Sequence, residues 1–448
     1  MKTTESPITA VDPLMSSLIQ GEKRRQQTTL MMIPSENHPS LAVEQALSSK
    51  LGSKYSEGYP KRRYYQGQEF ADKIEILTQD RARELFEVPH VNVQPLSGSP
   101  ANFAVYTALL EPGDTIMGLS LDAGGHLTHG ARASATSQFF HSVPYGARED
   151  GYIDYDGLEK LAQEHHPKII VAGITAYSRV LEWQRFADIA HGVGAYLMAD
   201  IAHLAGLVVG RSYPSPVPFV DVVTTTTHKT LRGPRGAMIM VTEKGLSRDE
   251  EMGDKIDKAV FPGLQGGPHM NTIAAIGVAL KEATSLEFAD YASQVVINAR
   301  VLAKELDNQG LNLVTGGTDS HLLLIDLRNM NLTGNTVAEG LEKAGIVVNR
   351  NSIPHDPNPP FYPSGLRLGT PALTSRGMKD EQLRDIGIYI SNVIGDLSQA
   401  KSDLGLTLED ERKAAGRKRI IEAAKAIPEV GEQILALCKR FPLKKVYI

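Results

Sequence analysis

Residues 222–236 read VVTTTTHKTLRGPRG, in which a β-branched run leads into His228 and Lys229 and then into a loop marked by glycine and proline. The valines and threonines favour a strand, so Lys229 is expected just beyond the carboxyl end of that strand. Desolvation at such a position lowers the pKa of an amine and makes it a usable nucleophile, suited to a Schiff base with an aldehyde cofactor. A lysine in this place is by itself more often an ordinary residue at the rim of a sheet, so other residues must support the assignment.

Further apolar runs of strand length lie on both sides of this stretch. They are continuous and rich in branched residues, which is typical of strands buried on both faces of a mostly parallel sheet: IIVAG (169–173), AYLMAD (195–200), VDVVTTTT (220–227) and AMIMV (237–241). Helical patterns lie between them, for example at 155–165 and 184–192. Strands that alternate with helices predict an α/β fold with a large doubly wound, mostly parallel sheet, in which ligands bind beyond the carboxyl ends of the strands.

The chain is expected to divide into three parts. Residues 1–30 would form an N-terminal helical arm, because Leu14 and Leu18 share one helical face. Residues 31–285 would form the large, cofactor-binding domain. Residues 286–448 would form a smaller C-terminal α/β domain, with the strand candidates HLLLIDL and GIVVN.

Composition narrows the class of protein. Of 448 residues, 42% are hydrophobic and 22% are charged, as in a globular protein with a large core. Lysine and arginine number 47 against 52 acidic residues, and the net charge of -5 gives nucleic acid no footprint. The one cysteine, Cys438, cannot form an internal disulfide. No apolar run reaches the ~18 residues of a membrane span, and the N-terminus lacks a secretory pattern. We therefore expect a cytoplasmic protein without a membrane or nucleic-acid partner.

Asp200 supports the assignment of Lys229. It ends the strand candidate AYLMAD and should lie at the same edge of the sheet as Lys229. A carboxylate there could hold a pyridine nitrogen protonated, which makes the ring an electron sink. The alternative is that Asp200 only caps the helix expected in AHLAGLV.

A candidate phosphate site lies upstream in LSGSPAN. Ser97, Gly98 and Ser99 offer hydroxyl and backbone N–H groups at an expected helix start, and Pro100 suits the first helical position. The motif by itself could be a simple N-cap turn. A phosphate cup, a carboxylate for a pyridine nitrogen and a Schiff-base lysine, in this chain order, together indicate pyridoxal phosphate as the cofactor.

Two histidines in GGHLTHG, His126 and His129, have a spacing that could suggest a metal pair. A metal site needs further ligands, and none lies nearby in the sequence, so we expect no metal. An imidazole packed on the face of the cofactor ring explains His126 better. His203, in ADIAHLAG, fits a polar partner beside the cofactor.

These residues resemble the serine hydroxymethyltransferase family closely and over nearly the whole chain. The stretches that carry the resemblance are IPSEN, KYSEGYP, RRYYQG, NVQPLSGSPANFAVY, GGHLTHG, ITAYSRV, MADIAHLAGL, TTTTHKTLRGPRG, FPGLQGGPH, VNRNSIPHDP and SGLRLGTPALTSRG. The resemblance implies a fold-type I transferase with pyridoxal phosphate covalently bound to Lys229. It also implies the interconversion of L-serine plus tetrahydrofolate and glycine plus 5,10-methylenetetrahydrofolate, with tetrahydrofolate as co-substrate.

The same resemblance implies roles for individual residues. Catalytic roles fall to Lys229, Glu57, Tyr65 and His126. Cofactor contacts fall to Tyr55, Ser97, Gly98, Ser99, His126, Ser178, Asp200, His203, His228, Lys229 and Gly263. Substrate contacts fall to Ser35, Glu57, Tyr65 and Arg367, whose guanidinium would fork onto the substrate carboxylate. Folate contacts fall to Leu121, Gly125, Leu127 and Asn351. The family also implies a homodimer, possibly a tetramer, in which Tyr55, Glu57, Tyr65 and Gly263 come from the partner chain.

The chain departs from the family wording near the substrate and folate side. Lys61 replaces a glycine and Gln66 replaces another in the loop that usually reads GYPGKRYYGG, and such glycines permit special backbone angles. His38-Pro39 follows SEN where an aromatic residue often stands. These changes leave open a paralogue that uses 2-methylserine, or a folate-independent aldolase acting on threonine-like substrates. A non-catalytic scaffold or RNA-binding regulator is the remaining alternative.

Overall fold

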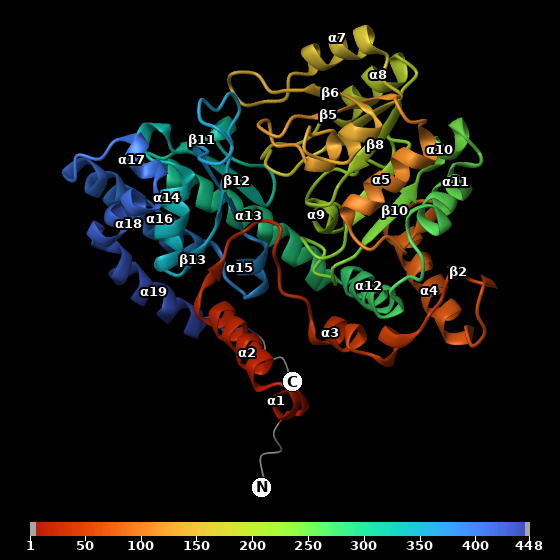
Figure 1. The fold of residues 1–448 in the computed structure, drawn as a ribbon, viewed down its shortest axis with the longest axis horizontal. Helices are drawn as coiled ribbons and strands as arrows, with labels where there is room; N and C mark the ends of the chain where they lie inside the picture. Colours follow the sequence, from red (N-terminus) through yellow and green to blue (C-terminus); the bar gives the residue numbers. More distant parts are fainter. Residues whose placement is uncertain (1–5, 444–448) are drawn as a thin grey trace.

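A seven-stranded sheet forms the centre of the larger part of the molecule (Figure 1). The computed structural model describes residues 6–443. The strand order is β4 (His90–Asn92), β10 (Ala237–Val241), β9 (Val222–Thr226), β8 (Tyr196–Asp200), β7 (Ile169–Gly173), β5 (Thr115–Leu119) and β6 (His141–Tyr145). β9, β8, β7, β5 and β6 are parallel to one another, whereas β10 runs antiparallel to β9 and β4. The predicted mostly parallel α/β sheet is confirmed.

Successive residues of the central strands enter different hydrophobic cores, one on each face of the sheet. In β7, Ile169 and Val171 pack into the core that contains α5 (Gly98–Leu109). Ile170 and Ala172 pack into the core that contains α7 (Tyr155–His165) and α8 (Trp183–Gly192). This alternation follows from the two-residue period of a strand. Since both faces are covered, the strands are apolar throughout, which explains why the sequence shows continuous apolar runs.

The helices around this sheet are short to medium in length. They are α3 (Leu41–Leu47), α4 (Glu69–Phe86), α5 (Gly98–Leu109), α6 (Thr136–Phe139), α7 (Tyr155–His165), α8 (Trp183–Gly192), α9 (Ala205–Val209), α10 (Glu243–Arg248), α11 (Met252–Lys258) and α12 (Met270–Ala283). A small hairpin, β2 (Gly58–Tyr59) and β3 (Arg62–Arg63), precedes α4. The bounds of β7 and α7 coincide with the runs predicted from the sequence.

The second core lies around a four-stranded antiparallel sheet. Its order is β11 (Asn312–Leu313), β12 (Leu322–Asp326), β15 (Gly365–Gly369) and β14 (Asn349–Asn351). The helices of this part are α14 (Gly334–Lys343), α15 (Pro371–Ser375), α16 (Asp380–Asp403), α17 (Leu408–Arg412), α18 (Ala414–Ala423) and α19 (Ala426–Arg440). Long helix α13 (Leu286–Asn308) joins the two parts: Phe288 packs in the first core and Leu302 packs in the second (Figure 1).

The N-terminal arm consists of α1 (Pro7–Val11) and α2 (Pro13–Thr28), which extend from the body of the molecule (Figure 1). Residues 1–5 of the expected arm lie outside the described residues. The arm ends in β1 (Leu30–Met31), which pairs in parallel with β13 (Ile346–Val347). Leu30 is therefore part of the second core, so the chain passes through that core before it enters the larger part. None of the helices within residues 6–443 is both long and apolar enough to cross a bilayer.

Candidate active site

The ends of the central strands bring the predicted chemistry-bearing side chains to one edge of the large sheet. Asp200 is the last residue of β8, and Lys229 follows shortly after β9, which ends at Thr226. Since β8 and β9 are adjacent and parallel, their carboxyl ends meet at this edge. Only 9% of Lys229 is exposed. Burial lowers the pKa of its amine to about 8, although the charge of Asp200 acts in the opposite direction.

Asp200 is held as an anion by neighbouring donors. The amide of Asn102 donates to Asp200 Oδ2 at 2.8 Å, and His129 Nε2 lies 3.0 Å from the same oxygen. The backbone N–H of His126 donates to His129 Nδ1, so the hydrogen of this imidazole is on Nε2 and points to the carboxylate. Burial by itself raises the pKa of Asp200, but the hydrogen bond from His129, the electrostatic effect of His129 and His126, and the hydrogen bond from Asn102 together hold the pKa well below its ordinary value. Such a carboxylate can pair with a protonated pyridine nitrogen.

Asn102 and His129 were not predicted as site residues, although both lie in motifs that the sequence singled out. Asn102 also accepts a hydrogen bond from Thr224 at 2.7 Å, which ties α5 to β9 under the carboxylate. The available signal was a polar residue in an otherwise apolar helix, PANFAVYTAL. Its direction toward Asp200 depends on how α5 packs, which a sequence pattern does not give.

The same residues gather three possible metal ligands. One ligand atom each from His126, His129 and Asp200 lies within 4.8 Å of the others. Asp200 is distant in the sequence from GGHLTHG, and the fold brings it next to both histidines. Both nitrogens of His129 have hydrogen-bond partners, and Nδ1 of His126 lies 2.7 Å from Thr128 Oγ1. Hydrogen bonding accounts for the cluster, and the expectation of no metal stays a prediction.

The amino end of α5 has the properties of the predicted phosphate cup. Ser97 is its N-cap residue, and its side chain makes no capping hydrogen bond. A Cβ on Gly98 would lie 2.9 Å from Thr226 Cγ2, so glycine alone permits this close approach to β9. One expectation is corrected: Pro100 is the third helical residue and not the first. Proline is tolerated there because the N–H groups of a first helical turn have no helical partner.

His228, next to Lys229 in the chain, adds a further group that could bind a phosphate. Its Nδ1 is buried without a partner in the described part of the chain. Burial and the charges of Lys229 and Arg235 lower the pKa of its imidazole to about 3. A neutral imidazole with a spare nitrogen, a free helix N-terminus and the hydroxyls of Ser97 and Ser99 suit a phosphate group. With the amine of Lys229 and the anionic Asp200, these residues fit pyridoxal phosphate.

Ser178 and His203, both predicted to contact the cofactor, have different surroundings. His203 is buried, and its pKa is lowered well below the ordinary value, first by burial and then by the charge of Lys229. Ser178 Oγ lies 2.8 Å from Thr315 Oγ1 in the second part of the chain. Within residues 6–443 no hydrogen bond joins Ser178 to Lys229 or His203, so its role as a cofactor ligand stays a prediction.

Arg367 lies on β15 with spare donors. Its Nε donates to Asn349 Oδ1 at 3.1 Å, and Nη1 donates to the carbonyl of Thr175 at 2.5 Å. Burial lowers the pKa of Arg367 to about 10, so the guanidinium remains charged at neutral pH. Ser35, the predicted helper, follows Pro34, which packs so tightly on Gly369 that a Cβ there would clash. This packing brings Ser35 to the strand that carries Arg367.

Tyr55, Glu57 and Tyr65 form a separate group, in which both tyrosines are exposed and Glu57 is half-buried. The rings of Tyr55 and Tyr65 are 5.3 Å apart and edge to face, and 56% and 46% of these residues are exposed. The carboxylate of Glu57 raises the pKa of the Tyr55 phenol and lies against Gly266, close in sequence to exposed Gly263. Among the described residues, no hydrogen bond or ion pair connects this group with Lys229, Asp200 or Arg367.

Lys61 stands where the family usually has a glycine, and its backbone adopts a conformation that glycine favours. Lys61 has φ of 65°, in the left-handed region that glycine adopts freely. Its backbone N–H donates to Asp72 Oδ2 at 2.9 Å, and this bond helps to hold the turn between β2 and β3. Gln66 is not among the residues with positive φ, whereas Gly67 is, with φ of 71°.

The predicted folate residues occupy two places. Leu121, Gly125 and Leu127 share the loop after β5, where Leu121 and Leu127 are 45% and 50% exposed. Gly125 donates its N–H to the carbonyl of Ser120 at 2.8 Å and is buried. Asn351 ends β14 and donates to the carbonyl of Ser352. No hydrogen bond within residues 6–443 joins Asn351 to the loop, so the structure does not by itself assemble a folate site.

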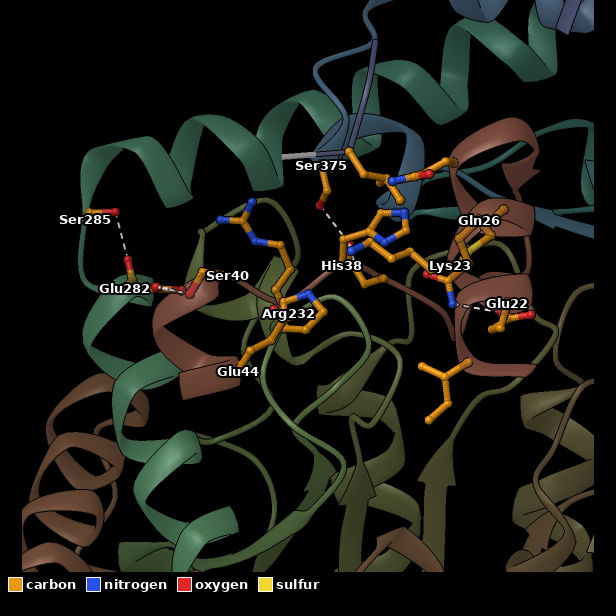
Figure 2. A pocket seen from close by; sticks show the side chains of 16 residues that line it. Glu22, Lys23, Gln26, His38, Ser40, Glu44, Arg232, Glu282, Ser285 and Ser375 are labelled. Carbon is orange, nitrogen blue, oxygen red and sulfur yellow. Dashed lines mark hydrogen bonds between the residues drawn. The ribbon is translucent and has the colours of Figure 1, made fainter. Parts of the chain in front are cut away.

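A cavity of about 870 Å³ is lined by residues of α2, α3 and the ends of α12 and α15 (Figure 2). No residue predicted for the site lines it. Its wall includes Asn37, whose amide donates to the carbonyl of Lys229 at 2.9 Å and accepts from Ser375 Oγ at 2.7 Å. Asn37 therefore links the lysine loop to α15, and the sequence offered no signal for it beyond its place in IPSEN.

Comparison with known proteins agrees with this geometry. Residues 8–390 match the family model described as serine hydroxymethyltransferase. The chain is 52% identical over 425 residues to the serine hydroxymethyltransferase of Acidothermus cellulolyticus, with 95% of this chain and 97% of the relative covered. It is 55% identical over 384 residues to the protein of the same name from Sorangium cellulosum, with 86% and 89% covered. The corresponding protein of Desulfotalea psychrophila is 49% identical over 431 residues, with 96% and 94% covered.

Proposed function

The chain belongs to the serine hydroxymethyltransferase family, and from this premise we propose that it interconverts L-serine plus tetrahydrofolate and glycine plus 5,10-methylenetetrahydrofolate. It is a pyridoxal-phosphate enzyme with tetrahydrofolate as co-substrate. One observation carries the proposal: Lys229 and Asp200 are buried together at one edge of the sheet. Lys229 has a pKa of about 8, and Asp200 is held as an anion.

Pyridoxal phosphate, when bound, supplies an electron-poor ring that stabilises negative charge at the α-carbon of an amino acid. Lys229 would hold the cofactor covalently, since its lowered pKa leaves a usable fraction of neutral amine. Asp200 would keep the pyridine nitrogen protonated, and the end of α5 with Ser97, Ser99 and His228 would bind the phosphate. His126, neutral because burial lowers its pKa to about 4, would pack against the ring.

Arg367 would bind the carboxylate of the amino-acid substrate. Its spare donors, fixed direction and buried charge suit a bidentate contact, which an ammonium group could not reproduce. Ser35 would assist from the turn beside β15. Glu57 would move a proton at the substrate hydroxyl, with Tyr65 as its neighbour.

The active site is proposed to form between two copies of the chain. Tyr55, Glu57, Tyr65 and Gly263 would complete the site of the partner subunit, with Tyr55 and Gly263 contacting its cofactor. The exposure of Tyr55, Tyr65 and Gly263, and the lack of a hydrogen bond or ion pair from this group to Lys229 within residues 6–443, support this arrangement. A two-fold homodimer supplies the same loop to both sites, and a tetramer of such dimers is compatible with it. Leu121, Gly125, Leu127 and Asn351 would bind folate.

The proposed location is the cytoplasm, because Cys438, the single cysteine, is a free and buried thiol. The proposed domains are the arm (1–30), the cofactor domain (31–285) and the smaller domain (286–448).

The deciding experiment is a donor screen with purified protein. L-serine, D-serine, threonine and 2-methylserine are each incubated with and without tetrahydrofolate, and methylenetetrahydrofolate is measured. Folate-dependent product from L-serine supports the proposal. Product only from 2-methylserine, or folate-independent cleavage of threonine as the main reaction, would replace it by one of the two alternatives.

A further inference from the structure

His321 is a buried histidine that the proposed activity does not use. It directly precedes β12, is 0% exposed, and its carbonyl accepts the N–H of Thr370 at 3.1 Å. Its Nε2 lies 3.1 Å from Nδ1 of His203, and the two rings stack at 27° with centroids 5.4 Å apart. Two buried imidazoles that share one hydrogen bond must have complementary tautomers.

The surroundings of His321 decide which ring donates. Burial lowers the pKa of both imidazoles, that of His321 to about 3, so both are neutral. If His203 were the donor, the hydrogen of His321 would sit on Nδ1, which is buried and has no partner among the described residues. Buried N–H groups without a partner are rare in folded proteins. The hydrogen therefore lies on Nε2 of His321 and is donated to Nδ1 of His203.

This contact leaves His203 in one tautomer. A neutral imidazole that accepts at Nδ1 carries its hydrogen on Nε2. Within residues 6–443, Nε2 of His203 makes no hydrogen bond. This nitrogen is not completely enclosed by the protein. The carbonyl of His203 accepts the hydroxyl hydrogen of Thr230, the residue after Lys229, at 3.0 Å, so His203 lies beside the lysine loop.

We infer that His321 is a positioning residue that fixes His203 as an N–H donor toward the cofactor pocket. The acceptor would be the phenolic oxygen of pyridoxal phosphate, and this part of the inference rests on the proposed function. The tautomer of His203 does not rest on it, because the geometry between the two rings is complete in the chain itself.

The test is nitrogen NMR of the cofactor-free protein labelled with ¹⁵N-histidine. Long-range proton–nitrogen correlations distinguish the two tautomers of each ring, and His203→Gln and His321→Gln spectra identify the signals. We expect both His203 and His321 as Nε2–H tautomers. A spectrum that shows His203 protonated on Nδ1, or charged near pH 8, would overturn the inference.

Two substitutions separate positioning from simple packing. In His321→Gln the amide can still donate from a similar place, so His203 should keep its tautomer. In His321→Leu the volume is filled but the donor is lost, so His203 should no longer be confined to Nε2–H. The dissociation constant for pyridoxal phosphate should then rise roughly tenfold, as expected for one lost hydrogen bond. His141→Gln, at an exposed position, is the control for histidine loss.

The outcomes distinguish the inference from the proposed function. An unchanged tautomer and cofactor affinity in His321→Leu would overturn the positioning role. If His321→Leu and His321→Gln both lose cofactor equally, packing and not the hydrogen bond is responsible, which also overturns it. Failure of the parent protein to bind pyridoxal phosphate would remove the proposed function, and the tautomer measurement would still decide the contact between the two histidines.

Discussion

The group around Lys229 and the loop around Glu57 differ in how completely one chain builds them. Lys229, Asp200 and Arg367 are between 7% and 9% exposed, and the last two have fixed hydrogen-bond partners. Tyr55 and Tyr65 are about half exposed, and their rings pack edge to face on each other. Asp200 ends buried strand β8, Lys229 follows buried strand β9, and Arg367 lies within buried strand β15, so the core of the chain fixes this group. The second group lies on a polar loop that leaves both tyrosine side chains largely open to solvent.

The largest effect is expected from Lys229→Ala. Turnover should fall by at least ~10³-fold because the amine nucleophile is removed, while far-UV circular dichroism stays that of the parent. Lys160→Ala, on the exposed side of α7, is the matched control. Borohydride reduction of the loaded parent and peptide mapping should label Lys229 alone, and a label on another lysine would show that the buried group is not the reacting one.

Arg367→Ala should weaken serine binding by roughly a hundredfold or more, because two charge-assisted hydrogen bonds of about 1.5–3 kcal/mol each are lost. Cofactor absorbance should be unchanged. Arg367→Lys should recover little of the affinity, since an ammonium cannot form the planar pair of contacts. Serine affinity within about threefold of the parent in the alanine variant would place the carboxylate elsewhere.

The pH dependence of the free energy of unfolding tests how deeply the group around Lys229 is buried, because this group contains a lysine with a lowered pKa. In the cofactor-free protein the pKa of Lys229 is about 8 when folded, against about 10.4 when unfolded. Between these values the unfolded state binds more protons, so stability rises with pH.

Between pH 7.5 and 10.5, the free energy of unfolding of the parent should therefore rise by on the order of 2–3 kcal/mol relative to that of Lys229→Met. Denaturant titrations of both proteins at each pH measure this difference. Titration of the tyrosines contributes equally to both proteins and cancels. A difference that stays flat or falls with pH would mean that the amine is not desolvated.

Mixing two inactive chains tests whether the exposed loop serves a partner. Glu57→Ala and Lys229→Ala chains, exchanged under conditions that allow subunits to mix, should form heterodimers with one intact site. Random pairing then returns up to about a quarter of parent activity. Background activity in confirmed mixed dimers would place Glu57 and Lys229 in the same chain's site.

The smallest effect is expected at Lys61. Its φ of 65° is costly for a residue with a Cβ, so Lys61→Gly should stabilise the loop by about 1 kcal/mol or less. Lys61→Ala, which keeps the Cβ, should show no such gain. Melting temperatures of the three proteins compare them, and a lower value for the glycine variant would indicate that the lysine side chain contributes more than its backbone angle costs.

The sequence was most informative where burial is complete. The runs around Asp200 and Lys229 and the helix before Ile169 correspond to observed elements, because a strand covered on both faces must be apolar at every position. Prediction was less accurate at helix ends. Pro100 is the third residue of α5, since any of the first helical positions accepts a residue without an N–H.

The sequence by itself determined the fold class, the family and the chemical types of the cofactor site, because periodicity and the order of motifs along the chain record local requirements. Only the tertiary structure decided which polar groups meet. The contacts of Asp200 with Asn102 and His129, of Asn37 with the Lys229 carbonyl, and of His203 with His321 join residues far apart in the chain. Their formation depends on how helices and strands pack in three dimensions, and a hydrogen bond requires an alignment within a few tenths of an ångström that no spacing rule specifies.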